Sequence, residues 1–161
     1  MKRTAVHVIL SFSIGEIMKT KFEKESEVLE LVRSFEDTTI ARGEWKHAEH
    51  LVVALYYITR HDMETATGKM RDGIFNLLRK AFSVDLTKEM PYHETLTVFW
   101  MRTIAEFNAS KNGASLLGKA NEVAAVYDKD YPLRFYSREF LFSDRAREEF
   151  VDPDLDVHVQ P

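Results

Sequence analysis

Apolar residues recur at helical spacing along most of this chain. From Glu23 onward, Val28, Leu31, Val32 and Phe35 occupy the i, i+3, i+4 and i+7 positions of an amphipathic helix, with charged residues between them. The same period predicts four further helices, over residues 44–59, 63–81, 92–108 and 114–126. The pattern therefore predicts an all-α protein.

The predicted helix over residues 44–59 is apolar around nearly its whole circumference. One narrow stripe on a helical wheel is predicted to face solvent: Lys46, Glu49, Val53 and Arg60. The other positions are apolar except for His47 and His50. A helix of this kind packs on several sides, so we expect it at the centre of the fold, with two imidazoles in or beside the core.

Short joints between the predicted helices favour an antiparallel bundle of four to five main helices. After Tyr127 the helical period is lost. Residues 131–142 are aromatic and basic, which predicts a strap over the bundle or across one end, followed by a short helix over residues 145–150. The predicted organisation is an N-terminal segment without a clear pattern, a single helical domain and a tail: residues 1–22, 23–155 and 156–161.

The N-terminus has some features of a signal peptide, because Lys2 and Arg3 precede an apolar run over residues 5–14. His7 and two serines interrupt this run, and no small-x-small cleavage site follows. A short strand or a docking segment is the favoured interpretation. No run approaches the ~20 apolar residues of a membrane helix, so the sequence predicts a cytoplasmic protein without a membrane partner.

Composition and charge exclude several classes of function. The 161 residues carry a net charge of −4, which argues against nucleic acid as a partner because phosphate binding needs a basic face. There are no cysteines, which excludes disulfides, thiolate metal sites and cysteine nucleophiles. Phosphate-binding loops, dinucleotide fingerprints and the serine-hydrolase elbow are also missing from the sequence.

Three histidines face the predicted core, His47 and His50 on one helix and His93 on another. Two ligands at i, i+3 with a third from a neighbouring helix would form a three-ligand metal site with a position open for water or substrate. Zinc or iron suits imidazole and carboxylate ligands. Glu44, one turn before His47, and Glu94, next to His93, are candidates for a fourth ligand or a general base.

The same histidines fit two other interpretations. They can carry out acid/base chemistry without a metal, or each can simply satisfy a backbone carbonyl or a carboxylate in the core. The residues predicted to contact a small-molecule ligand are Trp45, Tyr57, Tyr92, Thr97 and Trp100. The aromatic members of this set also fit a plain core, and the Thr97 hydroxyl can bond the carbonyl four residues earlier.

Four blocks of sequence stand out together: Trp45–Leu51, Tyr92–Thr97, Phe142–Arg147 and Val151–Leu155. They resemble a family of small uncharacterised bacterial proteins with Trp-x-His-x-x-His-Leu, Tyr-His-Glu-Thr-x-Thr and a closing Pro-Asp-Leu. Lys46 stands where family members usually have a small polar residue. The resemblance spans about residues 35–155 and implies no reaction. It implies that the two histidine blocks belong together and that the Phe-Ser-x-x-Ala-Arg segment is part of the domain.

Two functions remain open from the sequence. The first is a small bacterial enzyme with a buried His/Glu site, of hydrolase or oxygenase type, acting on a small molecule with or without one zinc or iron ion. The second is a non-catalytic helical binding or interaction module whose histidines are structural. A homodimer through the first helix or the aromatic strap is compatible with either function.

Overall fold

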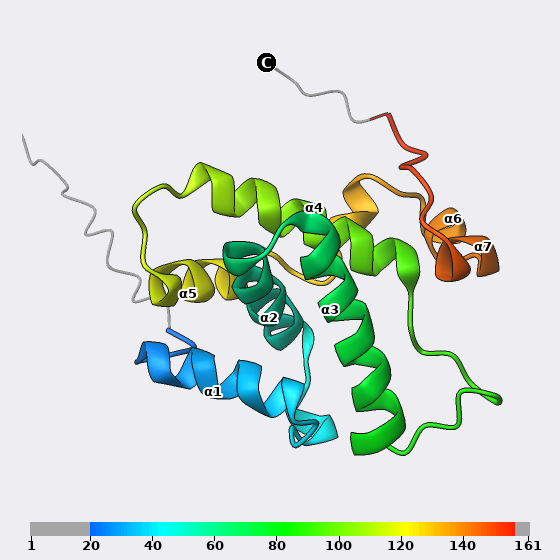
Figure 1. The fold of residues 1–161 in the computed structure, drawn as a ribbon. Helices are drawn as coiled ribbons and strands as arrows, with labels where there is room; N and C mark the ends of the chain where they lie inside the picture. The colour runs from blue at the N-terminus through cyan, green and yellow to red at the C-terminus, as the bar shows by residue number, and fades with distance from the viewer. Residues whose placement is uncertain (1–19, 157–161) are drawn as a thin grey trace, which may run out of the picture.

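The computed structural model describes residues 20–156, and these form a bundle of helices without a strand (Figure 1). The α-helices are α1 (Glu25–Glu36), α2 (His47–Arg60), α3 (Met63–Asn76), α4 (Glu94–Ser110), α5 (Leu116–Val126), α6 (Arg138–Leu141) and α7 (Asp144–Glu148). There are also two 3-10 turns, η1 (Arg42–Glu44) and η3 (Tyr131–Arg134), and one π-helical turn, η2 (Leu77–Ala81). The predicted all-α bundle is confirmed. The expectations for residues 1–19 and 157–161 lie outside the described residues.

Helix α2 is the centre of the fold and packs against α1, α3, α4 and α5 (Figure 1). Its position is as predicted, but its solvent-facing stripe is not. Val53 is fully buried, and Glu49 is buried and forms an ion pair with Lys21 at 2.5 Å. The prediction was wrong at these two positions because four neighbouring helices leave little of α2 free.

Helix α2 begins at His47, three residues later than the sequence pattern indicated. The preceding residues form the separate turn η1, in which the Glu44 backbone N–H donates to the Ala41 carbonyl at 2.9 Å. The Lys46 N–H donates to the Glu49 carboxylate at 3.2 Å and closes the first turn of α2. Glu44 is therefore exposed and lies outside the helix that carries the histidines.

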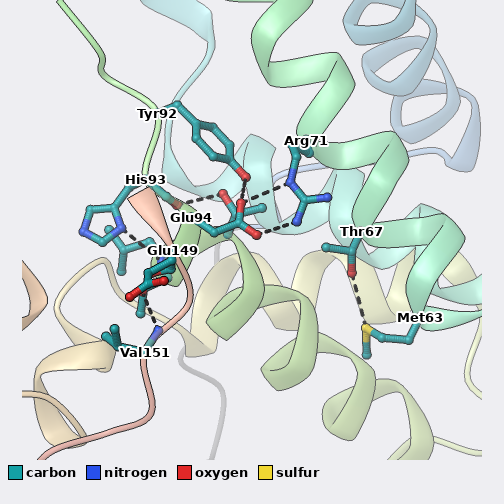
Figure 2. Close-up of polar contacts among 11 residues, drawn as sticks. Met63, Thr67, Arg71, Tyr92, His93, Glu94, Glu149 and Val151 are labelled. Carbon is teal, nitrogen blue, oxygen red and sulfur yellow. Dashed lines mark hydrogen bonds and ion pairs between the residues drawn. The ribbon is translucent and has the colours of Figure 1, made fainter. Parts of the chain in front are cut away.

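Helix α4 begins at Glu94, with His93 as its N-cap residue. Thr95 is fully buried, because α7 packs against α4 at this end of the bundle. The Thr95 hydroxyl donates to the Glu149 carbonyl at 3.0 Å and accepts from the Val151 N–H at 3.1 Å (Figure 2). Thr95 therefore connects α4 to the backbone of the C-terminal segment through two hydrogen bonds.

The C-terminal aromatic segment has a small core of its own, formed by Phe99, Tyr136, Leu141, Ala146 and Val151. The buried Tyr136 hydroxyl donates to the Val151 carbonyl at 2.8 Å. Asp154 accepts hydrogen bonds from the Ser137 N–H at 2.7 Å and from its hydroxyl at 2.5 Å. The strap is therefore an integral part of the domain at least as far as Asp154.

Replacing Thr95 with valine is expected to lower the free energy of unfolding by about 2 kcal/mol, because a buried N–H and a carbonyl each lose their partner. Thr97→Val is the matched control. The Thr97 hydroxyl donates only to the His93 carbonyl, which also accepts from the Thr97 N–H, so a change within about 0.5 kcal/mol is expected. Urea denaturation measures the free energy of unfolding of both variants. An equal decrease in the two would contradict the role given to Thr95.

Candidate functional site

A cavity of about 340 Å³ lies between α2, α3 and α4. Six of the residues singled out from the sequence line it: His47, His50, Tyr92, His93, Thr97 and Trp100. Most of the remaining wall is apolar, with Leu51 and Ala54 from α2, Met70 and Ile74 from α3, and Met101 from α4. Among the residues that the structure describes, no Asp, Glu, Lys or Arg lines this cavity.

His47 is held by the carbonyl of Tyr127, which lies 3.1 Å from its Nε2. A carbonyl can only accept, so the hydrogen is on Nε2 and the other ring nitrogen, Nδ1, is an acceptor in the neutral imidazole. The ring also lies against Trp100, with centroids 4.9 Å apart. Burial lowers the pKa of His47 despite the favourable carbonyl contact, so the neutral form prevails at neutral pH.

His50 has the opposite tautomer. Its Nδ1 lies 2.9 Å from the Lys46 carbonyl and must donate, which leaves Nε2 as the acceptor. The ring is tilted against the Trp45 indole, with centroids 4.0 Å apart. Burial lowers the pKa of His50 to about 4, and the neighbouring His47 acts in the same direction.

His93 has both ring nitrogens bonded to the backbone. Its Nδ1 accepts from the Leu96 N–H at 3.3 Å as the cap of α4, so Nε2 carries the hydrogen and donates to the Leu141 carbonyl at 2.8 Å. Burial lowers the pKa of His93, and the charge of Arg147 lowers it further. His93 therefore joins the start of α4 to the end of α6 and has no nitrogen free for other chemistry.

The predicted zinc or iron site with three histidine ligands is not assembled in residues 20–156. Within that range no three His, Cys, Asp or Glu side chains are grouped so that they could hold a metal ion. Three protein ligands are the usual minimum for a catalytic zinc, and His93 is already bonded through both nitrogens. The side chains present around the cavity thus do not fit the metal ion that the sequence pattern suggested.

Neither predicted acid lines the cavity with the histidines. Glu44 is exposed in η1. Glu94 accepts from Arg71 Nε at 3.1 Å and from Arg71 Nη2, and it accepts from the Tyr92 hydroxyl at 2.5 Å (Figure 2). Burial alone would raise the pKa of Glu94, but the bonds from Arg71 and Tyr92 outweigh it and hold that pKa below its usual value.

Arg71 is a residue that the sequence pattern did not single out. It lies on α3, off the apolar stripe, and reaches the start of α4 across 23 positions of sequence. The ion pair with Glu94 therefore connects two of the helices that enclose the cavity. Position on a helical wheel gives no sign of such a pair, because the partner is on another helix.

Two of the predicted ligand-contacting residues lie elsewhere. Trp45 stacks on Phe35 of α1 with centroids 4.8 Å apart and contacts the His50 ring, but it does not line the cavity. The Tyr57 hydroxyl donates to Glu36 at 3.1 Å, also on the α1 side, and burial raises its pKa. For Thr97 the hydroxyl does bond the helix carbonyl four residues earlier, at 3.0 Å, while the residue still lines the cavity.

Comparisons of the chain with protein-family models, with curated proteins and with solved structures find no match. The resemblance of the histidine blocks to an uncharacterised family therefore stays a prediction. Within residues 20–156, none of the helices combines the length and apolar character that a membrane crossing requires.

Proposed function

We propose that this protein binds an uncharged, mostly apolar small molecule in the cavity between α2, α3 and α4. The observation that carries the proposal is the pair His47 and His50, which line an otherwise mostly apolar cavity and each have one ring nitrogen left without a partner in the described chain. Ligand pockets typically combine an apolar wall with a few well-placed polar groups. The volume of about 340 Å³ suits a molecule of one or two small rings.

An uncharged ligand fits this cavity better than an ion because the wall offers no opposite charge. Its lining residues in the described chain include no carboxylate, ammonium or guanidinium group. Burial also lowers the pKa values of His47 and His50, so their imidazoles are neutral near neutral pH. Moving an ion from water into such a site is costly without a partner for its charge. An uncharged molecule avoids that cost and gains from the apolar wall.

A second candidate is a small enzyme that uses the two histidines as general bases without a metal. A neutral imidazole with a fixed tautomer and a free acceptor nitrogen is what a general base requires. Backbone carbonyls orient the two rings here, in the role that a carboxylate has in many hydrolases. The cavity wall has no serine, cysteine or lysine in the described chain, so the chemistry would be proton removal, for example from water in a hydrolysis.

Thr97→Leu is expected to weaken binding of phenol and anisole at least tenfold, because a larger side chain fills part of the cavity. Thr103→Leu is the matched control, since Thr103 lies on the same helix but does not line the cavity. Calorimetric titration measures binding, and benzoate and benzylammonium are expected not to bind the wild-type protein.

Equal binding by the two leucine variants, or preferential binding of a charged compound, would contradict the proposal. Phenyl acetate separates the two candidates in the same proteins. Its hydrolysis by the wild type but not by His47→Phe would favour the enzyme, and binding without hydrolysis would favour the binding protein.

A further inference from the structure

We infer that the ligand of this cavity is a hydrogen-bond donor, such as an alcohol, a phenol or a primary amide, bound by His47 and His50. The inference rests on the proposed function, because it assumes that the cavity binds an uncharged small molecule. The ligand class is thereby restricted to hydrogen-bond donors, in contrast to molecules such as ethers and ketones that only accept hydrogen bonds.

Hydrogen bonds to backbone carbonyls fix the tautomers of the two histidines. The Tyr127 carbonyl takes the hydrogen of His47 Nε2, and the Lys46 carbonyl takes the hydrogen of His50 Nδ1. Both remaining nitrogens, His47 Nδ1 and His50 Nε2, are therefore acceptors. They come from adjacent turns of α2, three residues apart, so one small molecule can reach both.

The two acceptor nitrogens are accessible. In residues 20–156, every fully buried polar side-chain atom of a residue that is not itself exposed has a hydrogen-bond partner. Neither His47 Nδ1 nor His50 Nε2 has such a partner in that range, and both residues are only partly exposed. It follows that each nitrogen has a surface that another molecule can contact, and both residues line the same cavity.

Most other side-chain hydrogens of the wall are already used, and among the described residues only the indole N–H of Trp100 lacks a partner. The Tyr92 hydroxyl donates to Glu94 at 2.5 Å, and the Thr97 hydroxyl donates to the His93 carbonyl at 3.0 Å. The N–H of His93 donates to the Leu141 carbonyl at 2.8 Å. A ligand that only accepts hydrogen bonds could use at most this indole N–H, and it would leave both histidine acceptor nitrogens unpaired, which is unfavourable.

Phenol and anisole test this inference because they differ by one methyl group on the oxygen. Anisole is larger and more apolar, so burial of apolar surface alone would favour it. Calorimetric titration of the wild-type protein at neutral pH is expected to give a dissociation constant about tenfold lower for phenol, which is the effect of one hydrogen bond of about 1.4 kcal/mol. Anisole binding as tightly as phenol, or more tightly, would overturn the inference and leave the proposed pocket standing.

The variant His47→Phe, His50→Phe is expected to lose the preference for phenol while still binding anisole, because it keeps ring-sized side chains without the acceptors. His61→Phe, a histidine at the end of α2 that does not line the cavity, is the control and is expected to keep the preference. A preference retained in the double variant would overturn the inference.

Nitrogen-15 chemical shifts of the wild-type imidazoles provide a test that does not depend on a variant folding. Phenol is expected to shift His47 Nδ1 and His50 Nε2 and to leave both His93 nitrogens unchanged. Binding of phenol without these shifts would overturn the donor inference alone. Binding of neither phenol nor anisole would overturn the proposed function together with it.

Discussion

Gly73→Ala is expected to lower the free energy of unfolding by about 3 kcal/mol, the upper end of the usual cost of overpacking a core. A Cβ atom at Gly73 would lie 2.3 Å from both Cε1 and Cζ of the Phe35 ring. Phe35 is fully buried, stacked on Trp45 and tilted against Tyr57 at 6.3 Å between ring centroids. The ring is thus enclosed by other rings and has little room to move away from the added methyl group.

Gly68→Ala is the control for this prediction because both glycines lie in α3. A Cβ atom at Gly68 would meet nothing within 4 Å. Alanine normally stabilises a helix interior relative to glycine by about 0.5–1 kcal/mol, so Gly68→Ala is expected to raise stability by that amount. If α3 packs directly on Phe35, urea denaturation of the two variants will give changes of opposite sign in the free energy of unfolding. The same sign in both would show that this packing is looser than described.

Acidification from about pH 6.5 to pH 4 is expected to destabilise the fold by about 3 kcal/mol through His50 alone. Burial lowers the pKa of His50 to about 4 in the folded protein, against about 6.5 for an unperturbed histidine. Between these two pH values the unfolded chain binds a proton that the folded chain does not. The contribution of His50 to the free energy of unfolding is therefore fully present above pH 6.5 and decreases as the pH falls. Below about pH 4 both states are protonated and this contribution no longer changes.

His50→Asn removes the titrating group while its amide N–H₂ can still donate to the Lys46 carbonyl, as Nδ1 does now. Urea denaturation at pH 7, 5.5 and 4.5 measures the free energy of unfolding. This free energy is expected to depend clearly less on pH for the variant than for the wild type. Some dependence remains, because burial also lowers the pKa values of His47 and His93. His61→Asn is the control and is expected to behave like the wild type. Identical slopes for His50→Asn and the wild type would contradict the prediction.

The helices could be predicted from the sequence because an apolar stripe is a local property. Met70 and Ile74 lie four positions apart in the helix predicted over residues 63–81, and in the structure both line the cavity. The burial of Glu49 and Val53 could not be predicted in this way. A helical wheel records which positions are polar but not how many helices surround the element.

The three histidines were predicted to face the core and do line one cavity, but their hydrogen-bond partners could not be predicted. Glu94 follows His93 directly, yet successive helical residues point about 100° apart, and Glu94 faces Arg71 on α3 instead. The partners of His47, His50 and His93 are the backbone carbonyls of Tyr127, Lys46 and Leu141. Since every residue has a carbonyl, no side-chain pattern can reveal which one a histidine will meet.

The attachment of the C-terminal segment to α4 has a consequence for synthesis on the ribosome. His93 and Thr95 find their partners at Leu141, Glu149 and Val151 (Figure 2). A nascent chain that has emerged only as far as α5 already contains every cavity-lining residue identified here, but the start of α4 still lacks those partners. The cavity is therefore bounded by a fully bonded α4 only after α6 and α7 have also left the exit tunnel.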